Sequence, residues 1–378
     1  MKTSDNPFVI EGYVDKSLFC DRVEETNELL SALENGRNVV LISPRRMGKS
    51  GLIHHAFAQL KERGADVTCI YIDIFHTRSL KQLVETLAQA IVGLLDSPVE
   101  KAFSFIASMF KSLRPTLTAD EITGLPSLTL DVRAGDENAS LNEIFTYLKN
   151  SGKRVYIAID EFQQINEYPQ TGTEALLRSY IQQLPNVNFI YSGSKKHMMQ
   201  EMFGMPQRPF YQSSQTLSLK EISHENYYEF AAAHFAKAGI MLPRECFDII
   251  YDTVFGHTWY VQYWLNRLYS LSLPSEVTKE DIKQVLERIL RDEDDNFYTY
   301  FNALTAAQQR VMVAVAKEKI VTKVLSQKFI GQHKLPATST VKSAIEKLVS
   351  MDYIAENRGQ YSIYNRFFML WLVRNIKW

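Results

Sequence analysis

Short runs of apolar and β-branched residues alternate with helical patterns through the first 219 residues. Each run is nearly continuous, as expected for a strand that lies in a parallel sheet and is buried on both faces. The runs predict strands at 38–42, 67–74, 154–159, 187–191 and 215–219. Helical periodicity predicts helices at 23–33, 49–62 and 79–95. The alternation indicates an α/β domain with helices on both faces of its sheet.

Residues 97–142 interrupt this alternation between the second and third strands. The stretch contains Pro98, Pro115 and Pro126, and a short alternating piece, Ser-Leu-Thr-Leu-Asp-Val, at 127–132. It is longer than an ordinary connection in an α/β unit. We interpret it as an insertion in the α/β domain.

From Ser223 onward the pattern is helical. Helices are predicted at 225–238, 243–254, 258–270 and 278–291, followed by an acidic run at 292–295. We interpret the run as a solvated helix face, with a metal site as the alternative. Further helices are predicted at 305–317, 324–329 and 339–350, before a hairpin at 352–362 whose turn is Asn357-Arg358-Gly359-Gln360. Three helices followed by a hairpin is the order of a winged helix.

These patterns divide the chain into an α/β core at 1–219, a helical region at 220–300 and a winged-helix-like domain at 301–378. The aromatic stretch Phe367–Leu372 is too short to anchor the chain in a membrane, and we interpret it as a core strand or helix of the last domain.

Composition narrows the classes of protein that remain. With 46% hydrophobic and 22% charged residues, the chain is a folded globular protein. Its net charge of -1 excludes a uniformly basic nucleic-acid binder, although residues 319–378 hold ten basic residues against three acidic ones. The start of the sequence lacks the apolar run of a signal peptide and no segment is apolar enough to span a bilayer, so we expect a cytoplasmic protein without a membrane partner. Cys20, Cys69 and Cys246 have neither disulfide-framework nor zinc-site spacing.

The strand at 38–42 leads into a loop that is typical of phosphate binding. A phosphate needs backbone N–H donors, a helix N-terminus, a lysine and, for Mg²⁺, a hydroxyl group. The loop supplies all of these before the helix at 49–62, so we predict that it binds the phosphates of ATP and that Ser50 also binds Mg²⁺. The binding residues are Ser43, Arg45, Arg46, Met47, Gly48, Lys49 and Ser50. Ser43 stands where the general pattern GxxxxGK[ST] has glycine, which causes strain only if this position requires a positive φ.

Two adjacent carboxylates, Asp160 and Glu161, end the strand at 154–159. Neighbouring residues of a strand point in opposite directions, so the two can serve different atoms. We predict that Asp160 addresses Mg²⁺ and that Glu161 addresses the attacking water. A hydroxyl after the next strand, Ser194 in preference to Ser192, is predicted to lie between the two motifs and to sense the γ-phosphate. The plain alternative is that these polar residues only end buried strands.

Several motifs together resemble the archaeal-type P-loop ATPases of the AAA+ and STAND-like group. They are Phe19-Cys20-Asp21-Arg22 with Glu25, the Pro-Arg-Arg-x-Gly-Lys-Ser loop, Ile-Asp-Glu-Phe-Gln, the Ser-Gly-Ser after the fourth strand, Gly256-His257-Thr258 and the stretch 361–372. The resemblance implies a RecA-like ASCE core with Glu161 as catalytic base, an all-α lid over 220–300 and a C-terminal winged helix. It also implies that Phe19 and Arg22 lie beside the nucleotide base, that Ser194 is the sensor, and that His257 belongs to the lid motif near the nucleotide.

The chain departs from the family pattern at two places. Thr258 replaces the proline of the lid motif, and Tyr211-Gln212-Ser213 stands where the family often has Tyr-Gly-Arg. Arg208 lies close by in the sequence but does not match the missing arginine. Loss of an arginine at the transferring phosphate predicts slow intrinsic hydrolysis. Arg45 and Arg46 lie inside the loop and are candidates to replace the missing arginine. In one assignment Arg45 contacts phosphate and Arg46 has a structural role. In the other, one or both bind sheet carboxylates or a partner.

Three hypotheses of function follow. The leading one is a Mg²⁺-dependent ATPase in which the nucleotide, bound between the sheet edge and the lid, acts as a switch for the C-terminal winged helix. The second is an ATP-responsive DNA-binding regulator, which the helix at 339–350 with Lys342 and Lys347, and Arg358 in the wing, would support. The third is a nucleotide-binding scaffold that does not hydrolyse ATP. The winged helix could equally contact a protein partner.

Overall fold

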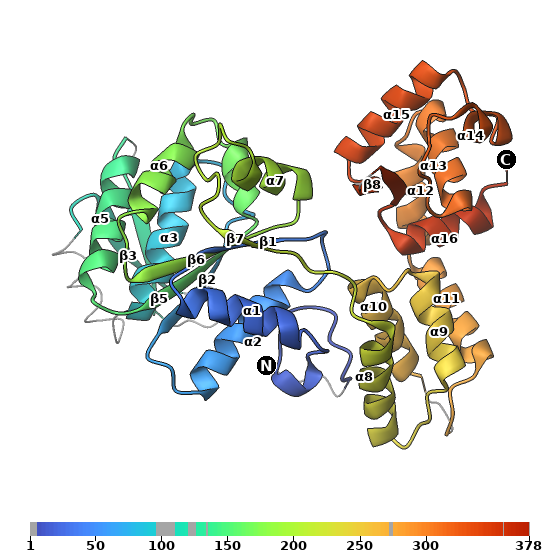
Figure 1. Ribbon diagram of the computed structural model, residues 1–378, viewed down its shortest axis with the longest axis horizontal. Coiled ribbons are helices and arrows are strands. Elements are labelled where there is room, and N and C mark those ends of the chain that lie inside the picture. Colours follow the sequence, from blue (N-terminus) through green and yellow to red (C-terminus); the bar gives the residue numbers. More distant parts are fainter. Residues whose placement is uncertain are drawn as a thin grey trace. The chain divides into compact units, whose positions relative to one another are not determined.

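The computed structural model describes residues 6–95, 110–119, 126–133, 135–271, 275–357 and 359–377. They belong to two compact units: one is Glu11–Ile222, and the other combines Met1–Ile10 with Ser223–Trp378. The first unit holds the elements from α1 to β7, and the second those from α8 to α16 (Figure 1).

The first unit is built on a parallel sheet whose strand order is β2-β5-β6-β1-β7. The strands are β1 (Val39–Ile42), β2 (Thr68–Asp73), β5 (Val155–Asp160), β6 (Val187–Gly193) and β7 (Gln215–Leu217). All residues of β1, β5 and β6 are buried, which explains their uninterrupted apolar sequences. The five predicted strands are confirmed within two residues at each end.

Helices cover both faces of this sheet (Figure 1). Alternate residues of a strand face opposite sides, so Val39 and Leu41 of β1 join one apolar core and Val40 and Ile42 join the other. The first core includes α1 (Val23–Glu34) and α2 (Lys49–Glu62). The second includes α3 (Leu80–Leu95), α5 (Glu137–Asn150), α6 (Thr173–Ile181), α7 (Lys196–Gly204) and the 3₁₀ helix η2 (Phe162–Glu167). A shorter 3₁₀ helix, η1 (Lys16–Leu18), precedes α1.

The segment expected as an insertion contains regular structure. β3 (Leu113–Ala119) and β4 (Pro126–Val132) form an antiparallel hairpin, and β4 coincides with the alternating piece at 127–132. Helix α5 already begins at Glu137, inside the range that the sequence assigned to the insertion. Its buried face packs in the core with α3, so this part of the segment contributes to the helical cover of the sheet. Residues 96–109 and 120–125 lie outside the described residues.

The second unit begins with four helices, as predicted. They are α8 (His224–Lys237), α9 (Arg244–Thr253), α10 (Thr258–Tyr269) and α11 (Lys279–Asp292). The N-terminal residues join this group, because the fully buried ring of Phe8 lies 5.4 Å from that of Phe235 and 5.7 Å from that of Tyr269. The Asn6 amide donates to the carbonyl of Asn266 at 2.9 Å. The sequence pattern had not indicated this packing of the chain start on the helical region.

The rest of the second unit has the winged-helix order that the sequence predicted. It contains α13 (Ala306–Glu318), α14 (Gln327–Gln332), α15 (Thr338–Ser350), the hairpin β8 (Ile354–Asn357) and β9 (Gln360–Ile363), and α16 (Arg366–Asn375). The aromatic end is a core helix, with Phe367, Phe368 and Trp371 buried. Arg358 in the turn lies outside the described residues.

An additional helix, α12 (Asp294–Asn302), begins within the acidic run at 292–295, and the sequence pattern does not predict it. The run is not purely solvated, since the carboxylate of Asp294 accepts a hydrogen bond from the indole of Trp371 at 2.6 Å.

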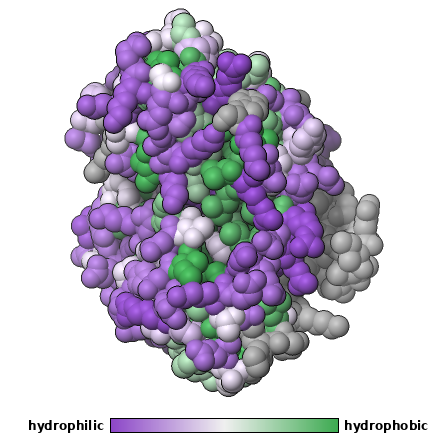
Figure 2. All heavy atoms as spheres, turned by 90° about the vertical axis from the view of Figure 1, so that its right-hand side faces the viewer, coloured by the Kyte–Doolittle hydropathy of each residue, from purple (hydrophilic) through white to green (hydrophobic). Residues whose placement is uncertain are grey.

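Figure 2 views the side at the right of Figure 1; hydrophilic residues cover most of that surface, with hydrophobic residues exposed between them. Within the described ranges, no helix has the length and apolar character needed to cross a membrane.

Candidate nucleotide-binding site

Three strand ends meet at the carboxyl edge of the parallel sheet. The loop Ser43–Ser50 follows β1, Asp160 ends β5, and Ser192–Ser194 follow Tyr191 in β6. β6 lies between β1 and β5, and Ile42 pairs with Gly193. The carboxyl edge of an open parallel sheet is the usual place for a ligand site in this class of fold. The topology therefore brings together the motifs that the sequence singled out.

The backbone conformation of the phosphate loop shows whether Ser43 is strained. Gly48 has φ of 92° and Arg46 has φ of 64°, whereas Ser43 is not among the residues with positive φ. Ser43 thus replaces the first glycine of the general pattern without the strain that a left-handed conformation would cause. Helix α2 begins at Lys49, directly after the loop, so its first N–H groups point toward the space in front of the loop.

The ammonium group of Lys49 is enclosed by the loop. Nζ donates to the carbonyl oxygens of Ser43 and Pro44, each at 3.0 Å, and the residue is only 6% exposed. Burial lowers the pKa of Lys49, and the carboxylates of Asp160 and Glu161 act in the opposite direction. A cation held against carbonyl dipoles at a helix N-terminus is well placed to bind phosphate oxygens.

Ser50 and Asp160 form a pair of oxygen ligands. The Ser50 hydroxyl donates to Oδ2 of Asp160 at 2.6 Å across 110 residues of sequence. Burial alone would raise the pKa of Asp160, but hydrogen bonds from Ser50 and Tyr71 lower it below the ordinary value. The carboxylate is therefore ionised at neutral pH. A hydroxyl and an ionised carboxylate next to a phosphate loop fit Mg²⁺, which prefers oxygen ligands.

Tyr71 is a site residue that the sequence reading missed. Its hydroxyl donates to the same oxygen of Asp160 as Ser50 does, and its ring centroid lies 4.3 Å from that of His54. Burial raises the pKa of Tyr71 above its usual range, so the phenol keeps its proton. The contact exists because β2 pairs directly with β5, with Asp73 opposite Asp160. Only this pairing could have identified Tyr71, since tyrosine is common in buried strands.

If the site hydrolyses Mg²⁺-ATP, as the sequence predicts, Tyr71→Phe is expected to weaken Mg²⁺ binding and to leave the phosphate loop intact. The variant takes away one of the donors that orient Asp160, so the Mg²⁺ concentration for half-maximal ATP hydrolysis should rise by about tenfold. A titration of the hydrolysis rate with MgCl₂ measures this. Tyr180→Phe is the control, because its hydroxyl lies on α6 and donates to Asn138 at 3.4 Å. An unchanged Mg²⁺ requirement in Tyr71→Phe would refute the positioning role.

Glu161 is held by a second network. It has φ of 55°, and its Oε2 accepts hydrogen bonds from Ser194 at 2.8 Å and from the amide of Gln163. Ser194 in turn accepts from Nε of Arg45 at 3.2 Å. Asp160 and Glu161 thus hydrogen-bond to different groups, although Glu161 lies after the end of β5 and not on the opposite face of the strand. Gln163 was not foreseen, and its position follows from the turn that Glu161 begins.

Arg22 lies beside the phosphate loop, and Phe19 lies beside the first turn of α2. Arg22 is 3% exposed and donates to the carbonyl of Met47 at 3.2 Å and to Glu25 at 2.7 Å, so it supports the loop backbone. The ring of Phe19 stacks on that of His55 with centroids 4.5 Å apart. A β-carbon on Gly51 would lie 3.1 Å from Phe19, which places this ring against the first turn of α2.

The remaining candidates are in different surroundings. Arg46 is exposed and Met47 is buried beneath the loop. Arg208 contacts Glu174 at 2.6 Å and Glu201 at 3.3 Å, so two carboxylates already bind its guanidinium group. His257 belongs to the second unit, where it precedes α10 and packs on Tyr260 with ring centroids 4.8 Å apart.

Comparison with known families gives two matches. Residues 19–264 match the family described as "ATPase domain predominantly from Archaea", and residues 295–374 match one described as "Probable winged helix domain". A comparison with curated proteins gives no match.

The similar solved structures include a Walker-type ATPase of Pyrococcus abyssi, with 18% identity, a TM-score of 0.66, and coverage of 97% of this chain and 99% of that one. The ORC2 protein of Aeropyrum pernix, solved in ADPNP–ADP complexes, has 12% identity, a TM-score of 0.57, and coverage of 98% and 97%. The ORC1 protein of the same organism, solved in complex with DNA, has 13% identity, a TM-score of 0.51, and coverage of 95% and 94%. At these identities the likeness concerns the fold alone.

Proposed function

The chain belongs to the family of ATPase domains found predominantly in Archaea, here joined to a winged helix domain, and we propose that it hydrolyses ATP with Mg²⁺ and serves as a nucleotide-dependent switch. The observation that carries the proposal is the 2.6 Å contact between Ser50 and Asp160 beside the buried Lys49. It unites the phosphate loop with the strand-end carboxylate in the arrangement that Mg²⁺-ATP requires.

Each residue of the site has a proposed task in an in-line attack of water on the γ-phosphate. The loop N–H groups and Lys49 bind the phosphates and take up negative charge as the bond to the leaving group breaks. Ser50 and Asp160 hold Mg²⁺, which when bound neutralises charge on the phosphate oxygens. Glu161 orients the attacking water and accepts its proton. Phe19 is proposed to contact the base, while Arg22 keeps the loop in shape.

The contact of Ser194 with Glu161 supports the switch. A serine hydroxyl has one hydrogen to donate, and here that hydrogen goes to Glu161. A γ-phosphate oxygen within reach would compete for the same hydrogen, so Ser194 would release Glu161 only when ATP is present. Arg45, which donates to Ser194, is positioned to follow the same change. Loss of the γ-phosphate would restore the original contact.

Coupling to the C-terminal half is the finer part of the proposal. We keep the division into an ATPase core at 1–219, a lid at 220–300 with His257, and a winged-helix domain at 301–378, and we propose that nucleotide state alters what the last domain binds. The STAND-like classification and a cytoplasmic location belong to the same proposal.

DNA is the second candidate ligand of the winged helix, and the excess of basic residues after Lys319 favours it. On α15, however, the side chain of Lys342 lies 3.9 Å from that of Glu346, which partly neutralises the exposed face of this helix. If the affinity for labelled duplex DNA differs between the ATP-bound and the ADP-bound protein, the chain is an ATP-responsive DNA-binding regulator. A protein partner is the alternative when no duplex binds.

The test is single-turnover hydrolysis of radiolabelled ATP with the protein in excess, with and without Mg²⁺. We expect ADP to form only with Mg²⁺, and slowly, because Tyr211-Gln212-Ser213 lacks the arginine of the family pattern and Arg208 is bound to Glu174 and Glu201. ATP that is retained but never cleaved would overturn hydrolysis and leave a nucleotide-binding scaffold.

A further inference from the structure

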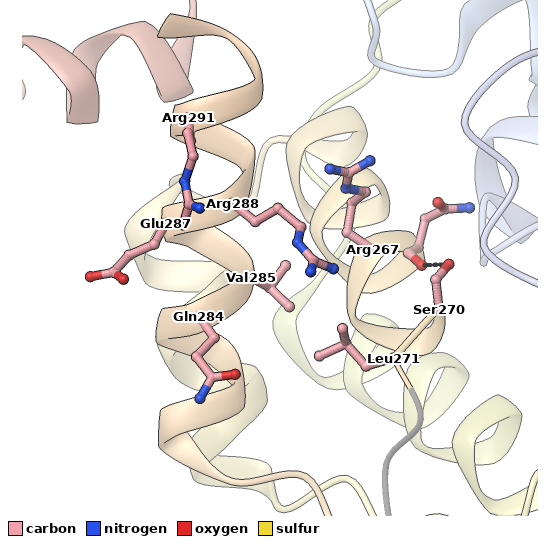
Figure 3. Close-up of a pocket in the computed structure, with 9 residues that line it drawn as sticks. Arg267, Ser270, Leu271, Gln284, Val285, Glu287, Arg288 and Arg291 are labelled. Atoms are coloured by element: carbon pink, nitrogen blue, oxygen red, sulfur yellow. Dashed lines mark hydrogen bonds between the residues drawn. The ribbon is translucent and has the colours of Figure 1, made fainter.

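A cavity lies between α10 and α11 in the second unit, and arginines are prominent in its lining. Its volume is about 390 Å³. Arg267 contributes from α10, and Arg288 and Arg291 contribute from α11. Figure 3 shows the Arg288 side chain extending from α11 toward α10, into the space in front of Arg267 and Leu271. The residues come from this unit alone, so the cavity is a feature separate from the phosphate loop.

The two α11 arginines do not pair with the carboxylates that their helix offers them. Asp292 is one turn beyond Arg288 but forms its ion pair with Arg267. Glu287 is one turn before Arg291, yet its contact is Arg374 of α16 at 3.8 Å. In the described part of the chain, no carboxylate lies within 4.0 Å of the guanidinium group of Arg288 or Arg291. Pairs four residues apart usually stabilise a helix. Both side chains are exposed at the cavity, so their guanidinium groups are accessible to an anion from solvent.

The remaining lining determines the kind of anion. Leu271 and Val285 add an apolar surface beside the guanidinium groups, and the side chain of Glu287 points away from α10 (Figure 3). Guanidinium groups bind phosphate through paired N–H donors, and several in one cavity suit a ligand with more than one phosphate group. The volume lies within the range of small-molecule pockets.

We propose that this cavity binds a small polyphosphate, either free or as part of a nucleoside di- or triphosphate, through Arg288 and Arg291, while Arg267 lines the same cavity and keeps its ion pair with Asp292. The two sources share the phosphate chemistry, and the apolar residues Leu271 and Val285 would contact a nucleoside when one is attached. The proposal does not depend on the proposed ATPase function, because none of the lining residues belongs to the phosphate loop.

The test measures binding by calorimetry to the full chain carrying Lys49→Ala, so that the phosphate loop contributes little. The probes are inorganic triphosphate and ATP. The double variant Arg288→Gln/Arg291→Gln is compared with Lys283→Gln/Arg310→Gln. The control removes the same charge from residues that are equally exposed but lie outside the cavity. The double substitution Arg288→Gln/Arg291→Gln should raise the Kd of triphosphate by about tenfold or more, and the control double substitution should raise it by less than about twofold.

Each result decides the proposal. If ATP has a lower Kd than triphosphate, and Arg288→Gln/Arg291→Gln removes this difference, the ligand is a nucleoside phosphate. Equal Kd values for the two probes indicate free polyphosphate. An equal Kd in both double variants overturns the site, as does the absence of binding of either probe to Lys49→Ala. Loss of duplex DNA binding in the arginine pair, without binding of either small probe, also overturns it in favour of nucleic acid. Thermal unfolding of each variant checks that the fold is intact.

Discussion

Glu161→Gln is expected to lower the single-turnover rate of ATP hydrolysis by about 10²- to 10⁴-fold while ATP still binds. The glutamine has nearly the shape of the carboxylate, so its oxygen can still accept the hydrogen bond that Ser194 donates at 2.8 Å. It cannot take a proton from water at neutral pH. The loop and Lys49 are untouched, and the variant therefore separates chemistry from binding.

The matched control for this variant is Glu167→Gln. Glu167 lies at the end of η2, close in sequence to Glu161, and its carboxylate is paired with Lys195. This variant should hydrolyse ATP at the rate of the unchanged protein, because the Glu167 carboxylate bonds to Lys195 and Gln164 and not to the residues of the site. If Glu161→Gln keeps more than about a tenth of the rate, Glu161 is not the base.

Lys49→Ala is expected to reduce both binding and hydrolysis. Lys49 is buried at 6% exposure, and its ammonium group already points into the loop, where it contacts the carbonyls of Ser43 and Pro44. Removing a charge-assisted contact to phosphate should weaken ATP binding by about 10²-fold, measured by calorimetry or by fluorescence of a labelled ATP. Hydrolysis should fall with it, because the same cation stabilises charge that develops in the transition state.

Lys61→Ala, at the exposed end of α2, is the control for this variant. It removes the same chemical group from the same helix, far from its N-terminus. Unfolding midpoints should be compared as well, since Lys49 also joins two loop carbonyls. Lys49→Ala that binds ATP as tightly as Lys61→Ala would mean that the loop does not bind the phosphates.

The elements whose formation is local could be predicted from the sequence. Alternating apolar runs predicted every strand of the parallel sheet, and the helix predicted at 49–62 has the same bounds as α2. The loop Ser43–Ser50 and the carboxylates at 160 and 161 could be recognised because phosphate chemistry requires particular residue types at a strand end. Backbone periodicity depends on neighbours a few residues apart, which the sequence displays directly.

Other features depended on which elements pack together. α12 was missed because its first two residues belong to the acidic run at 292–295, and the contact of Asp294 with Trp371 links residues 77 apart. Ser43 would be strained only with a positive φ, and the positive φ values of the loop occur at Arg46 and Gly48 instead.

The residues that orient Asp160 and Glu161 could be identified only from the packing of the strands. Tyr71 reaches Asp160 only because β2 lies next to β5, and Ser194 reaches Glu161 only because β6 lies between β5 and β1. The residues of these pairs are 89 and 33 positions apart. Strand order comes from the burial of whole helices on both faces of the sheet, a sum of many weak apolar contacts that no local pattern encodes. The chemistry of the motifs could therefore be predicted from the sequence, whereas the residues that orient them, Tyr71 and Ser194, depend on how the strands pack.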